Sequence, residues 1–589
     1  MPPRPHRSAR GSVPAPARTS AARGAGNGSG GEAREVEWQL AAPDLAGVQR
    51  WLEQHANLDD LRIEPLPVQH LHDAYLDTED WRVFRAGFAL RLRQKEGGLE
   101  ATLKGLRSAR KEVADRREIS EPLPHGASQK RIKALAQATG PVGRRVRDVA
   151  GVKPLRVLFE VQTSRSRFAV RGRHAGPPVG EIALDEARFS RANGHRRPMI
   201  LTRVELEAAD PDQATALERL AQRLCAECGL SPATENKFAA GLRSAALEPP
   251  RLGDSDRSPA PVQPAIDPAT SAGDFAASAL RRLLEEWRAH EPAARLGEGA
   301  AALHALRITG RRMDTVLGLF KDHLPAAVVK GRPKLKALVD ALGNVRDVDI
   351  RLDLVTQFRR TLPEEDRQAL DPLLRQLELE RDAARSGMLR ALDTKPAREW
   401  LDRLPDQLAR SSPTSSRSTR STGALRVVPD LIRKRYRKLR KCARRLTPES
   451  SLREHHKVRI RAKKLRYALE VVAPVYARAA DDMLAALHEL QSKLGTQHDA
   501  GDLAGYLTRL ATRPPAGFNP QTLFIMGRMA QLHAREAARL SGRIEKPWRK
   551  VHRKRWQGLR SRMEELRELR SPEAAGAPGQ SHAQGPNRH

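Results

Sequence analysis

The feature that most constrains this chain is a long internal repeat in its second half. HALRITGRRM begins at His304 and HKVRIRAKKL begins at His456, and both follow the pattern H-x-x-R-I-x-x-basic-basic-apolar. The offset of 152 residues between them (304 to 456) also relates LGNVRDVD at Leu342 to LGTQHDAGD at Leu494. Two motifs that share one offset indicate a duplication, and the surrounding Leu, Ala, Arg and Glu predict helices. We therefore expect two similar helical bundles.

Each repeat motif places its basic residues on one face of a helix, because successive residues turn by about 100°. The predicted basic faces hold His304, Arg307 and Arg311 in the first copy, and His456, Arg459, Lys463, Arg466 and Tyr467 in the second. Apolar residues lie opposite: Leu306, Gly310, Met313, Leu317 and Phe320, then Val458, Ala462, Leu465 and Leu469. A charged face is usually only solvated, but these stripes lack the interleaved Glu that relieves repulsion, and they occur twice. A bound polyanion is the better explanation, with Asp347 and Asp499 pairing with basic neighbours.

The chain carries a large excess of positive charge. Its 589 residues include 105 Lys and Arg against 71 Asp and Glu, a formal net charge of +34. An excess of this size predicts an anionic partner. Aromatic residues make up only 4%, so few side chains could stack on bases. The composition favours a partner made of phosphates without bases, and nucleic acid is not expected as a specific partner.

Changes of texture divide the chain into segments. Disorder-like compositions predict a basic tail at 1–31, a linker at 246–272, a Ser/Arg-rich connection at 411–422 and a tail at 571–589. Period-two runs such as EVEWQL and RVELEA predict strands within 32–245, interrupted by helices at 44–55 and 212–228. The period becomes helical over 273–570, with repeats at about 273–410 and 425–570. The predicted fold class is α+β, a strand-rich domain followed by an all-α domain.

The predicted strands carry charges of both signs on one face. A closed antiparallel barrel with a polar lumen would use this pattern, with carboxylates holding a divalent cation and basic groups holding phosphate oxygens. For any single strand, an open face in contact with water is the simpler explanation. The charged positions are Glu35, Glu37, Arg91, Arg93, Lys104, Arg116, Glu118, Arg165, Arg167, Glu181, Asp185, Glu205 and Glu207.

The helical repeat resembles the CHAD domain, the conserved-histidine α-helical domain, through its two H-x-x-R-I motifs and two L-G-x-x-x-D segments. The resemblance implies two pseudo-symmetric four-helix bundles with a basic groove that binds inorganic polyphosphate. It also implies the contacts, which would be His304, Arg307, Arg311, Arg312, His456, Arg459, Lys463, Lys464 and Arg466. The second copy has His498 where the first has Arg346.

The first half resembles the CYTH, or triphosphate tunnel metalloenzyme, family through EVEWQL, YLDTEDW, ALRLR, ATLK, RVELEA and a late Lys237. The resemblance implies an eight-stranded tunnel that hydrolyses a triphosphate with Mg²⁺ or Mn²⁺. The implied catalytic and metal residues are Glu35, Glu37, Glu205 and Glu207; the implied phosphate contacts are Arg91, Arg93, Lys104, Arg165, Arg167 and Lys237; Glu118 and Asp185 match acidic lumen positions. Gln39 stands where the family has Lys, and Asn236 where Ser is usual.

These observations predict a polyphosphate-binding protein whose barrel is a metal-dependent triphosphatase. Two alternatives stay open: a non-catalytic scaffold with a degenerate barrel, and a basic nucleic-acid-binding protein. Three Cys residues do not build a disulfide framework, and the C-x-x-C at Cys225 and Cys228 is better explained as a helix end than as a zinc site. No apolar run reaches the ~18 residues of a membrane helix. We expect a cytoplasmic protein, associated with polyphosphate granules, and no membrane partner.

Overall fold

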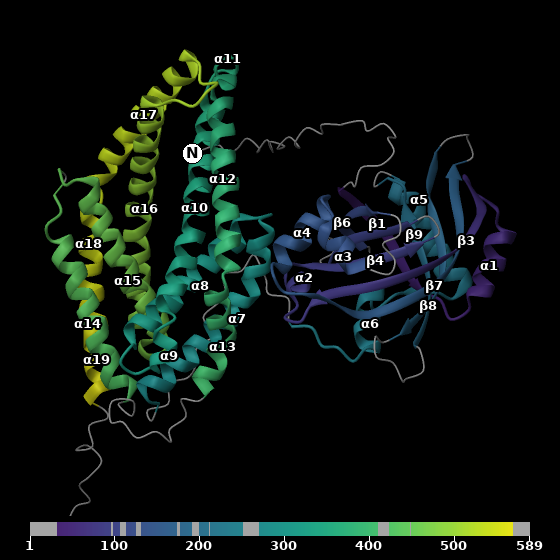
Figure 1. The fold of residues 1–589 in the computed structure, drawn as a ribbon, viewed down its shortest axis with the longest axis horizontal. Helices are drawn as coiled ribbons and strands as arrows, with labels where there is room; N and C mark the ends of the chain where they lie inside the picture. The colour runs from purple at the N-terminus through teal and green to yellow at the C-terminus, as the bar shows by residue number, and fades with distance from the viewer. Residues whose placement is uncertain are drawn as a thin grey trace, which may run out of the picture.

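The computed structural model describes residues 32–95, 98–106, 114–124, 131–172, 177–190, 199–210, 213–250, 270–409, 423–447 and 449–568. The predicted tails at 1–31 and 571–589, the 411–422 connection and most of the 246–272 linker lie outside these ranges. The described chain forms a strand-rich half and a helical half, seen at the right and left of Figure 1. The predicted order of an α+β domain followed by an all-α domain is confirmed.

The first half is one antiparallel sheet that closes on itself. Its ring runs β1-β6-β5-β4-β3-β7-β8-β9 and back to β1, because β1 pairs with β6 at its start and with β9 at its end. Eight strands therefore form the barrel, and two short strands, β2 and β10, are attached to β3 and β1. The strands are β1 (Glu32–Ala41), β2 (Asn57–Leu58), β3 (Leu61–Thr78), β4 (Phe88–Lys95), β5 (Gly98–Gly105), β6 (Ala114–Leu123), β7 (Leu155–Gly172), β8 (Pro178–Ser190), β9 (Met199–Ala208) and β10 (Ser231–Pro232).

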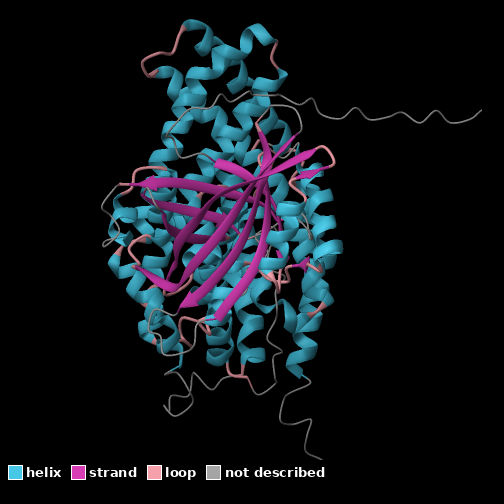
Figure 2. Ribbon diagram, turned by 90° about the vertical axis from the view of Figure 1, so that its right-hand side faces the viewer, coloured by secondary structure: helices cyan, strands magenta, loops and turns pink. Residues whose placement is uncertain are grey.

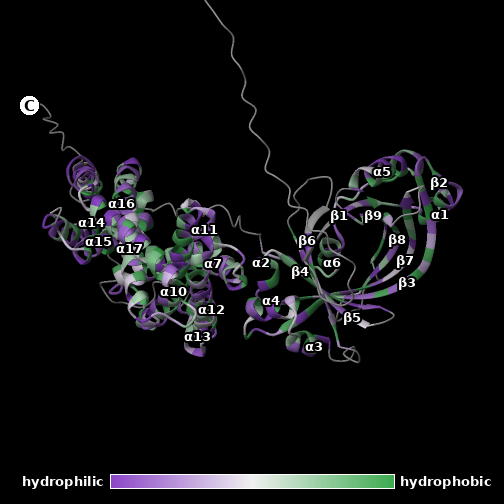
Figure 3. Cartoon of the chain, turned by 90° about the horizontal axis from the view of Figure 1, so that it is seen from above, coloured by the Kyte–Doolittle hydropathy of each residue, from purple (hydrophilic) through white to green (hydrophobic). Residues whose placement is uncertain are grey.

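Alternation along the strands sends apolar residues outward and charged residues into the lumen. The outward residues of β1, β8 and β9 pack beneath α1 and α5, around buried Leu206 and Leu224, and Figure 3 shows these helices beside the strands. The lumen is closed by α6, whose Phe238 packs against Tyr75 and Phe159 at one end. The helices of this half are α1 (Leu45–Gln54), α2 (Arg82–Arg85), α3 (Arg131–Gln137), α4 (Pro141–Ala150), α5 (Ala214–Cys228) and α6 (Lys237–Ser244).

The second half consists of helices that repeat with the offset seen in the sequence. Helices α7 and α14 begin 152 residues apart, at Ala272 and Ala424, and so do α8 and α15, at Ala300 and Leu452. Ser271 and Ser451 cap α7 and α15 by accepting a backbone hydrogen bond. The helices are α7 (Ala272–Leu296), α8 (Ala300–Leu319), α9 (Ala326–Val329), α10 (Arg332–Thr361), α11 (Glu364–Arg367), α12 (Asp371–Leu392), α13 (Lys395–Ala409), α14 (Ala424–Ala443), α15 (Leu452–Tyr476), α16 (Arg478–Thr512), α17 (Pro520–Ser541), α18 (Glu545–Lys550) and α19 (Trp556–Glu568).

The two copies share one hydrophobic core. Residues of α7, α8, α14 and α15 belong to the same buried cluster, and the predicted apolar faces are buried, including Leu306 and Met313 in the first copy and Ala462 and Leu465 in the second. The outer ends of α10, α12, α16 and α17 form a second cluster around buried Leu373 and Ile525. Two additional short helical turns, η3 (Gln368–Leu370) and η4 (Val551–Arg555), complete the described helical half. Figure 2, viewed from the side of the barrel, shows the helices behind the strands.

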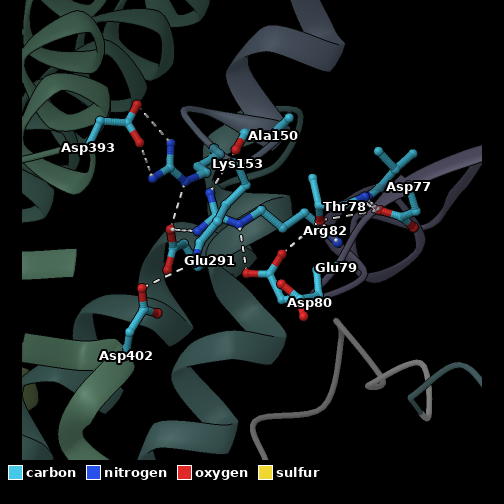
Figure 4. Close-up of polar contacts among 12 residues, drawn as sticks. Asp77, Thr78, Glu79, Asp80, Arg82, Ala150, Lys153, Glu291, Asp393 and Asp402 are labelled. Carbon is cyan, nitrogen blue, oxygen red and sulfur yellow. Dashed lines mark hydrogen bonds and ion pairs between the residues drawn. The ribbon is translucent and has the colours of Figure 1, made fainter. Parts of the chain in front are cut away.

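Buried ion pairs join the two halves. Arg295 of α7 is fully buried, and its guanidinium contacts Glu291 (2.8 Å) and Asp393 (2.9 Å). Arg82 of α2 lies 3.6 Å from the same Glu291 and donates to the backbone oxygen of Ala150 at the end of α4 (3.0 Å), as Figure 4 shows. Buried charges are stable only when they are paired and hydrogen-bonded, so this cluster fixes one orientation of the barrel against the helices.

Candidate functional site

The barrel lumen holds a cavity of about 380 Å³ that is lined by charged side chains. Its walls come from seven strands of the ring and from α6, so residues distant in sequence face one space. The charged and polar lining residues are Glu37, Gln39, Arg91, Arg93, Glu100, Lys104, Glu118, Ser120, Arg165, Glu205, Glu207, Asn236 and Lys237. Most of the predicted lumen residues thus meet in one cavity.

One wall of the cavity is acidic. Glu37 and Glu207 are cross-strand partners in the β1–β9 register, and Glu37 is only 5% exposed. Burial raises the pKa of Glu207, and the carboxylates of Glu37 and Glu118 raise it further, although Lys104 opposes them. Directly opposed carboxylates destabilise a sheet unless something neutralises them. This wall therefore has an excess of negative charge suited to a cation.

The opposite wall is a dense ion-pair network. Arg165 donates to both oxygens of Asp185 (2.7 Å each) and to Glu205 (2.6 Å). Lys237 contacts Asp185 and lies 2.9 Å from Glu205. Burial alone would raise the pKa of Glu205, but the Lys237 and Arg165 cations hold it below its ordinary value. Glu205 is thus paired with these two cations.

Further cations line the space between these walls. Lys104 lies 3.0 Å from Glu118 and Arg91 lies 3.8 Å from the same carboxylate. Arg93 donates to both oxygens of Asp73 (2.7 and 2.8 Å). Burial alone would raise the pKa of Asp73, but the charge and hydrogen bonds of Arg93, together with the Arg91 and Lys237 charges, lower it to about 2. Each of these cations is oriented by a carboxylate, so the lumen holds several fixed hydrogen-bond donors.

Gln39 takes part in a polar chain that the sequence did not reveal. Its amide donates to Glu37 (2.7 Å), and its oxygen accepts from Arg203 (3.1 Å). Arg203 is 2% exposed and shares the lumen face of β9 with Glu205, so a buried cation lies beside the position that the family fills with Lys. Alternation along RVELEA could have revealed Arg203, because it precedes Glu205 by two residues.

The helical half gathers a second set of cations on α8, α10, α15 and α16, where helices of the two copies contact one another, and we call this cluster the central groove. Arg307 and Arg311 of α8 interact electrostatically with Lys463 of α15, and His304 interacts with Arg346 of α10. The predicted stripes of the two copies therefore face one another. The charged and polar groups of the central groove are His304, Arg307, Arg311, Arg346, Asp347, His456, Arg459, Lys463, Arg466, His498 and Asp499.

Crowding perturbs the groups of the central groove. Burial lowers the pKa of Lys463 to about 7, and the Arg459, Arg307, Arg311 and Arg466 charges add to the effect. Burial and Arg459 also lower the pKa of His498 to about 4, and the His456 ring lies 4.5 Å from the His498 ring. Arg459 is balanced in part by Asp499 at 3.8 Å, which confirms the predicted acid–base pairing for this residue. The groove lacks enough acid to neutralise its cations.

Comparisons with known proteins match both halves. The CYTH domain family matches residues 34–241, and the CHAD domain family matches residues 278–508. The chain therefore contains a CYTH domain followed by a CHAD domain. A search of curated proteins gave no match.

Solved structures are each similar to a part of the chain. The CHAD domain from the plant Ricinus communis is 24% identical, covers 50% of this chain and 98% of its own, and gives a TM-score of 0.41. PptA from Streptomyces chartreusis is 23% identical, covers 48% and 100%, and gives 0.37. HpAC1 from Hippeastrum, a protein with a dominant triphosphatase activity, is 20% identical, covers 36% and 98%, and gives 0.28.

Several predicted residues of the CYTH domain lie apart from the lumen cavity. Arg167 pairs with Glu181 (2.7 Å) farther along β7 and does not line the cavity. The side chains of Glu35 and Arg116 lie outside the described residues. Asn236 caps α6 by accepting from the backbone of Ala239 (2.9 Å), a role that Ser also fills, so this departure from the family is structurally neutral.

Two predicted residues of the CHAD domain, Arg312 and Lys464, are placed differently from the expectation. Arg312 lies 3.0 Å from Glu470, and the same Glu470 contacts Arg466 (3.2 Å), so the expectation of a stripe without interleaved Glu is wrong at this end. Tyr467 is buried but keeps its predicted place beside the stripe, with the Arg466 guanidinium 4.7 Å from the centre of its ring. Lys464 lies on another face of α15, beside Arg461 and Arg435. Because consecutive helical residues diverge by about 100°, Lys463 and Lys464 cannot share one narrow stripe.

Of the predicted metal set, the structure describes the side chains of Glu37, Glu205 and Glu207. The described residues contain no group of three or more His, Cys, Asp or Glu side chains arranged to hold an ion. Glu37 and Glu207 nevertheless fit a divalent cation, because Mg²⁺ commonly binds through one or two carboxylates together with water and substrate phosphates. Cys225 and Cys228 are free, and Cys228 is the last residue of α5, followed by Gly229 in the left-handed conformation. No helix of the described residues could cross a membrane.

Proposed function

We propose that the CHAD domain binds inorganic polyphosphate in its central groove and that the CYTH domain hydrolyses triphosphate or a related short phosphate chain. The observation that supports the first part most directly is the meeting of uncompensated cations from both repeats. Like charges brought this close cost free energy unless a polyanion neutralises them. A flexible chain of phosphates can reach all of them at once, whereas a folded acidic surface cannot enter a groove between helices.

The proposal for the CYTH domain is supported by the division of its cavity into an acidic and a basic wall. A triphosphate would place its oxygens toward Arg91, Lys104, Arg165 and Lys237, which paired carboxylates hold in position. Glu37 and Glu207 would hold Mg²⁺ or Mn²⁺, which supplies charge neutralisation for the phosphates and the departing group. Glu37, held by the Gln39 amide, would also orient the attacking water.

The bond that breaks is the phosphoanhydride between the terminal phosphorus and its bridging oxygen. Water adds to the terminal phosphorus, and the electron pair leaves with the bridging oxygen on pyrophosphate. Positive side chains that face the bridging and terminal oxygens stabilise the charge that develops there. Lys237 and Arg165 are suited to this role because Glu205 and Asp185 fix both cations before the substrate enters.

The enzymatic part is tested with the full chain and tripolyphosphate, by measuring metal-dependent release of orthophosphate. We expect Glu37→Gln, which removes the charge and keeps the shape, to lower kcat by at least about a hundredfold. Glu186→Gln is a matched control, because Glu186 lies on β8 but contacts Arg188 on the exposed side. Wild-type turnover by Glu37→Gln would refute the triphosphatase and favour the scaffold alternative.

The binding part is tested with long-chain polyphosphate across a salt series. The double variant Arg307→Glu/Arg459→Glu should lose binding, whereas Arg440→Glu, an exposed reversal on α14, should retain it. Equal binding by all three proteins would mean that bulk charge suffices. DNA or RNA that displaces polyphosphate at equal phosphate concentration would favour the nucleic-acid alternative.

A further inference from the structure

A second basic pocket lies on the CHAD domain, between the end of α8 and helices α14 and α15. Its volume is about 250 Å³, and we call it the α14 pocket. A single carboxylate lines it, that of Asp322, which lies 3.7 Å from the neighbouring Lys321. The cations of the lining are Lys321, Lys434, Arg435, Lys438, Arg461 and Lys464. No function assigned above uses this pocket.

The duplication supplies an internal reference for this pocket. Shifting each residue by 152 positions gives the matching place in the other copy, which lies beside α7 and α8. The α14 pocket and its counterpart correspond as Lys434 to Arg282, Lys438 to Glu286, Arg461 to Thr309, Lys464 to Arg312, and Gly318 to Glu470. In the last pair, Gly318 belongs to the first copy but lines the pocket of the second, and Glu470 belongs to the second copy but contacts Arg312 of the first. A twofold relation between the copies requires this exchange.

The two equivalent places differ in charge. In the first copy, Arg312 lies 3.0 Å from Glu470 and 3.9 Å from Glu286, so carboxylates neutralise the cluster. In the α14 pocket both acids are replaced, one by Lys438 and the other by Gly318. Among the residues that the structure describes, no ion pair joins Lys434, Arg435, Lys438, Arg461 or Lys464 to a carboxylate.

The cations of the α14 pocket repel one another. Burial lowers the pKa of Lys464, and the Arg461 and Arg435 charges lower it further, with Asp314 opposing them. Asp314 is itself held by Arg332 at 2.7 Å, so it neutralises little of the pocket. The Nε of Arg435 is buried without a hydrogen-bond partner. A lost acid pair, a hollow and an unsatisfied donor together indicate that an external anion completes the site.

We propose that the α14 pocket is a second anion site, separate from the central groove, that binds an inorganic phosphate group. Its size is below that of typical ligand pockets, which suits a short anion such as pyrophosphate. The pocket and the central groove use different faces of α15, because Lys464 and Arg461 serve one and Lys463 and Arg459 serve the other. The proposal does not depend on hydrolysis by the CYTH domain.

The test measures protection of individual lysines in the full chain. Lysine acetylation is followed by mass spectrometry at increasing pyrophosphate, with chelator present to prevent turnover. We expect Lys438 and Lys464 to become protected. Gly318→Glu recreates the acid of the first copy. It should raise the pyrophosphate concentration needed for half-maximal protection of these lysines by at least about tenfold. A side chain at position 318 would meet the guanidinium group of Arg332, which can shift because it ends a long side chain, so this variant should fold, and its thermal unfolding verifies that.

Controls separate the possible sources of the phosphate. Lys434 protection that is lost in Lys438→Glu and retained in Arg440→Glu supports the pocket independently of Gly318. Protection by pyrophosphate that persists in Arg307→Glu/Arg459→Glu assigns the pocket to a free anion. Protection by long-chain polyphosphate alone, lost in that double variant, supports the site but assigns it to the end of a chain held in the groove. Absence of protection by either ligand, or protection unchanged by both Gly318→Glu and Lys438→Glu, overturns the proposal.

Discussion

Raising the pH through the neutral range should weaken polyphosphate binding, because Lys463 loses its proton. Burial lowers the pKa of this ammonium to about 7, with further lowering by the guanidinium groups around it. A bound phosphate chain adds negative charge beside Lys463 and so raises its pKa in the complex. The complex therefore holds a proton that the free protein loses above pH 7, and binding becomes coupled to proton uptake.

The size of this effect follows from the shift. If the pKa in the complex returns to the ordinary lysine value of about 10.4, affinity falls roughly tenfold per pH unit above 7, and about a hundredfold from pH 6 to pH 9. The neighbouring histidines do not oppose the trend. Burial lowers the pKa values of His304 and His456, and that of His498 falls to about 4, so a bound anion that raises them again acts in the same direction as it does at Lys463.

The assay is titration of long-chain polyphosphate at constant ionic strength from pH 6 to pH 9. Lys463→Arg keeps the charge at every pH, so its affinity for polyphosphate should depend little on pH. Lys463→Met should bind polyphosphate weakly, and its affinity should also depend little on pH. A wild-type slope shared by Lys463→Arg, or a flat wild-type profile, would refute the assignment of the proton to Lys463.

Ligand-free stability provides an independent check on the same group. The folded-state pKa lies below that of the unfolded chain, so between pH 7 and about 10 the unfolded chain binds more protons. The free energy of unfolding contributed by Lys463 should therefore rise with pH across this window and be lowest below pH 7. Urea denaturation of wild type and Lys463→Met at both ends of the window measures the difference.

Three other substitutions test the framework around the sites. Arg295→Met removes the main partner of buried Glu291, and we expect a loss of about 3–5 kcal/mol in the free energy of unfolding by urea denaturation. Arg203→Met frees the amide of Gln39, which should lower triphosphate turnover about tenfold at unchanged substrate affinity, with partial recovery in Arg203→Lys. Gly241→Ala places a methyl 2.0 Å from a buried phenylalanine ring, and overpacking should cost about 1–3 kcal/mol, measured as a lower Tm.

The periodic parts of the fold were predictable from sequence. Alternation along EVEWQL and RVELEA placed Glu37, Glu205 and Glu207 on one face, and the single offset of the repeat predicted the two helical copies. Both signals depend on local geometry, which a chain expresses without knowledge of its partners. The lumen and the central groove could therefore be outlined before any contact was known.

Side-chain contacts between different strands and helices could not be predicted from periodicity. Glu205 was grouped with the metal ligands, yet the register sets it opposite Gln39 and leaves it to Arg165 and Lys237. Arg346, which approaches His304 in the central groove, was present in LGNVRDVD but gave no sign of its direction. The contact of Arg82 with Glu291 depends on how two finished domains meet, and no local pattern encodes that.

Carboxylates neutralise the cations of the lumen more fully than those of the central groove. The two sites should therefore prefer different ligands. In the lumen, Arg165, Lys104 and Arg93 each have a carboxylate partner, so a bare polyanion would compete with acids already in place. A phosphate that arrives with a divalent cation adds little net charge and uses both walls of the cavity. In the central groove, Lys463 faces mainly other cations, so an unaccompanied polyanion would relieve that repulsion. Screening by salt should consequently weaken binding in the groove far more steeply than binding of the metal-complexed substrate in the lumen.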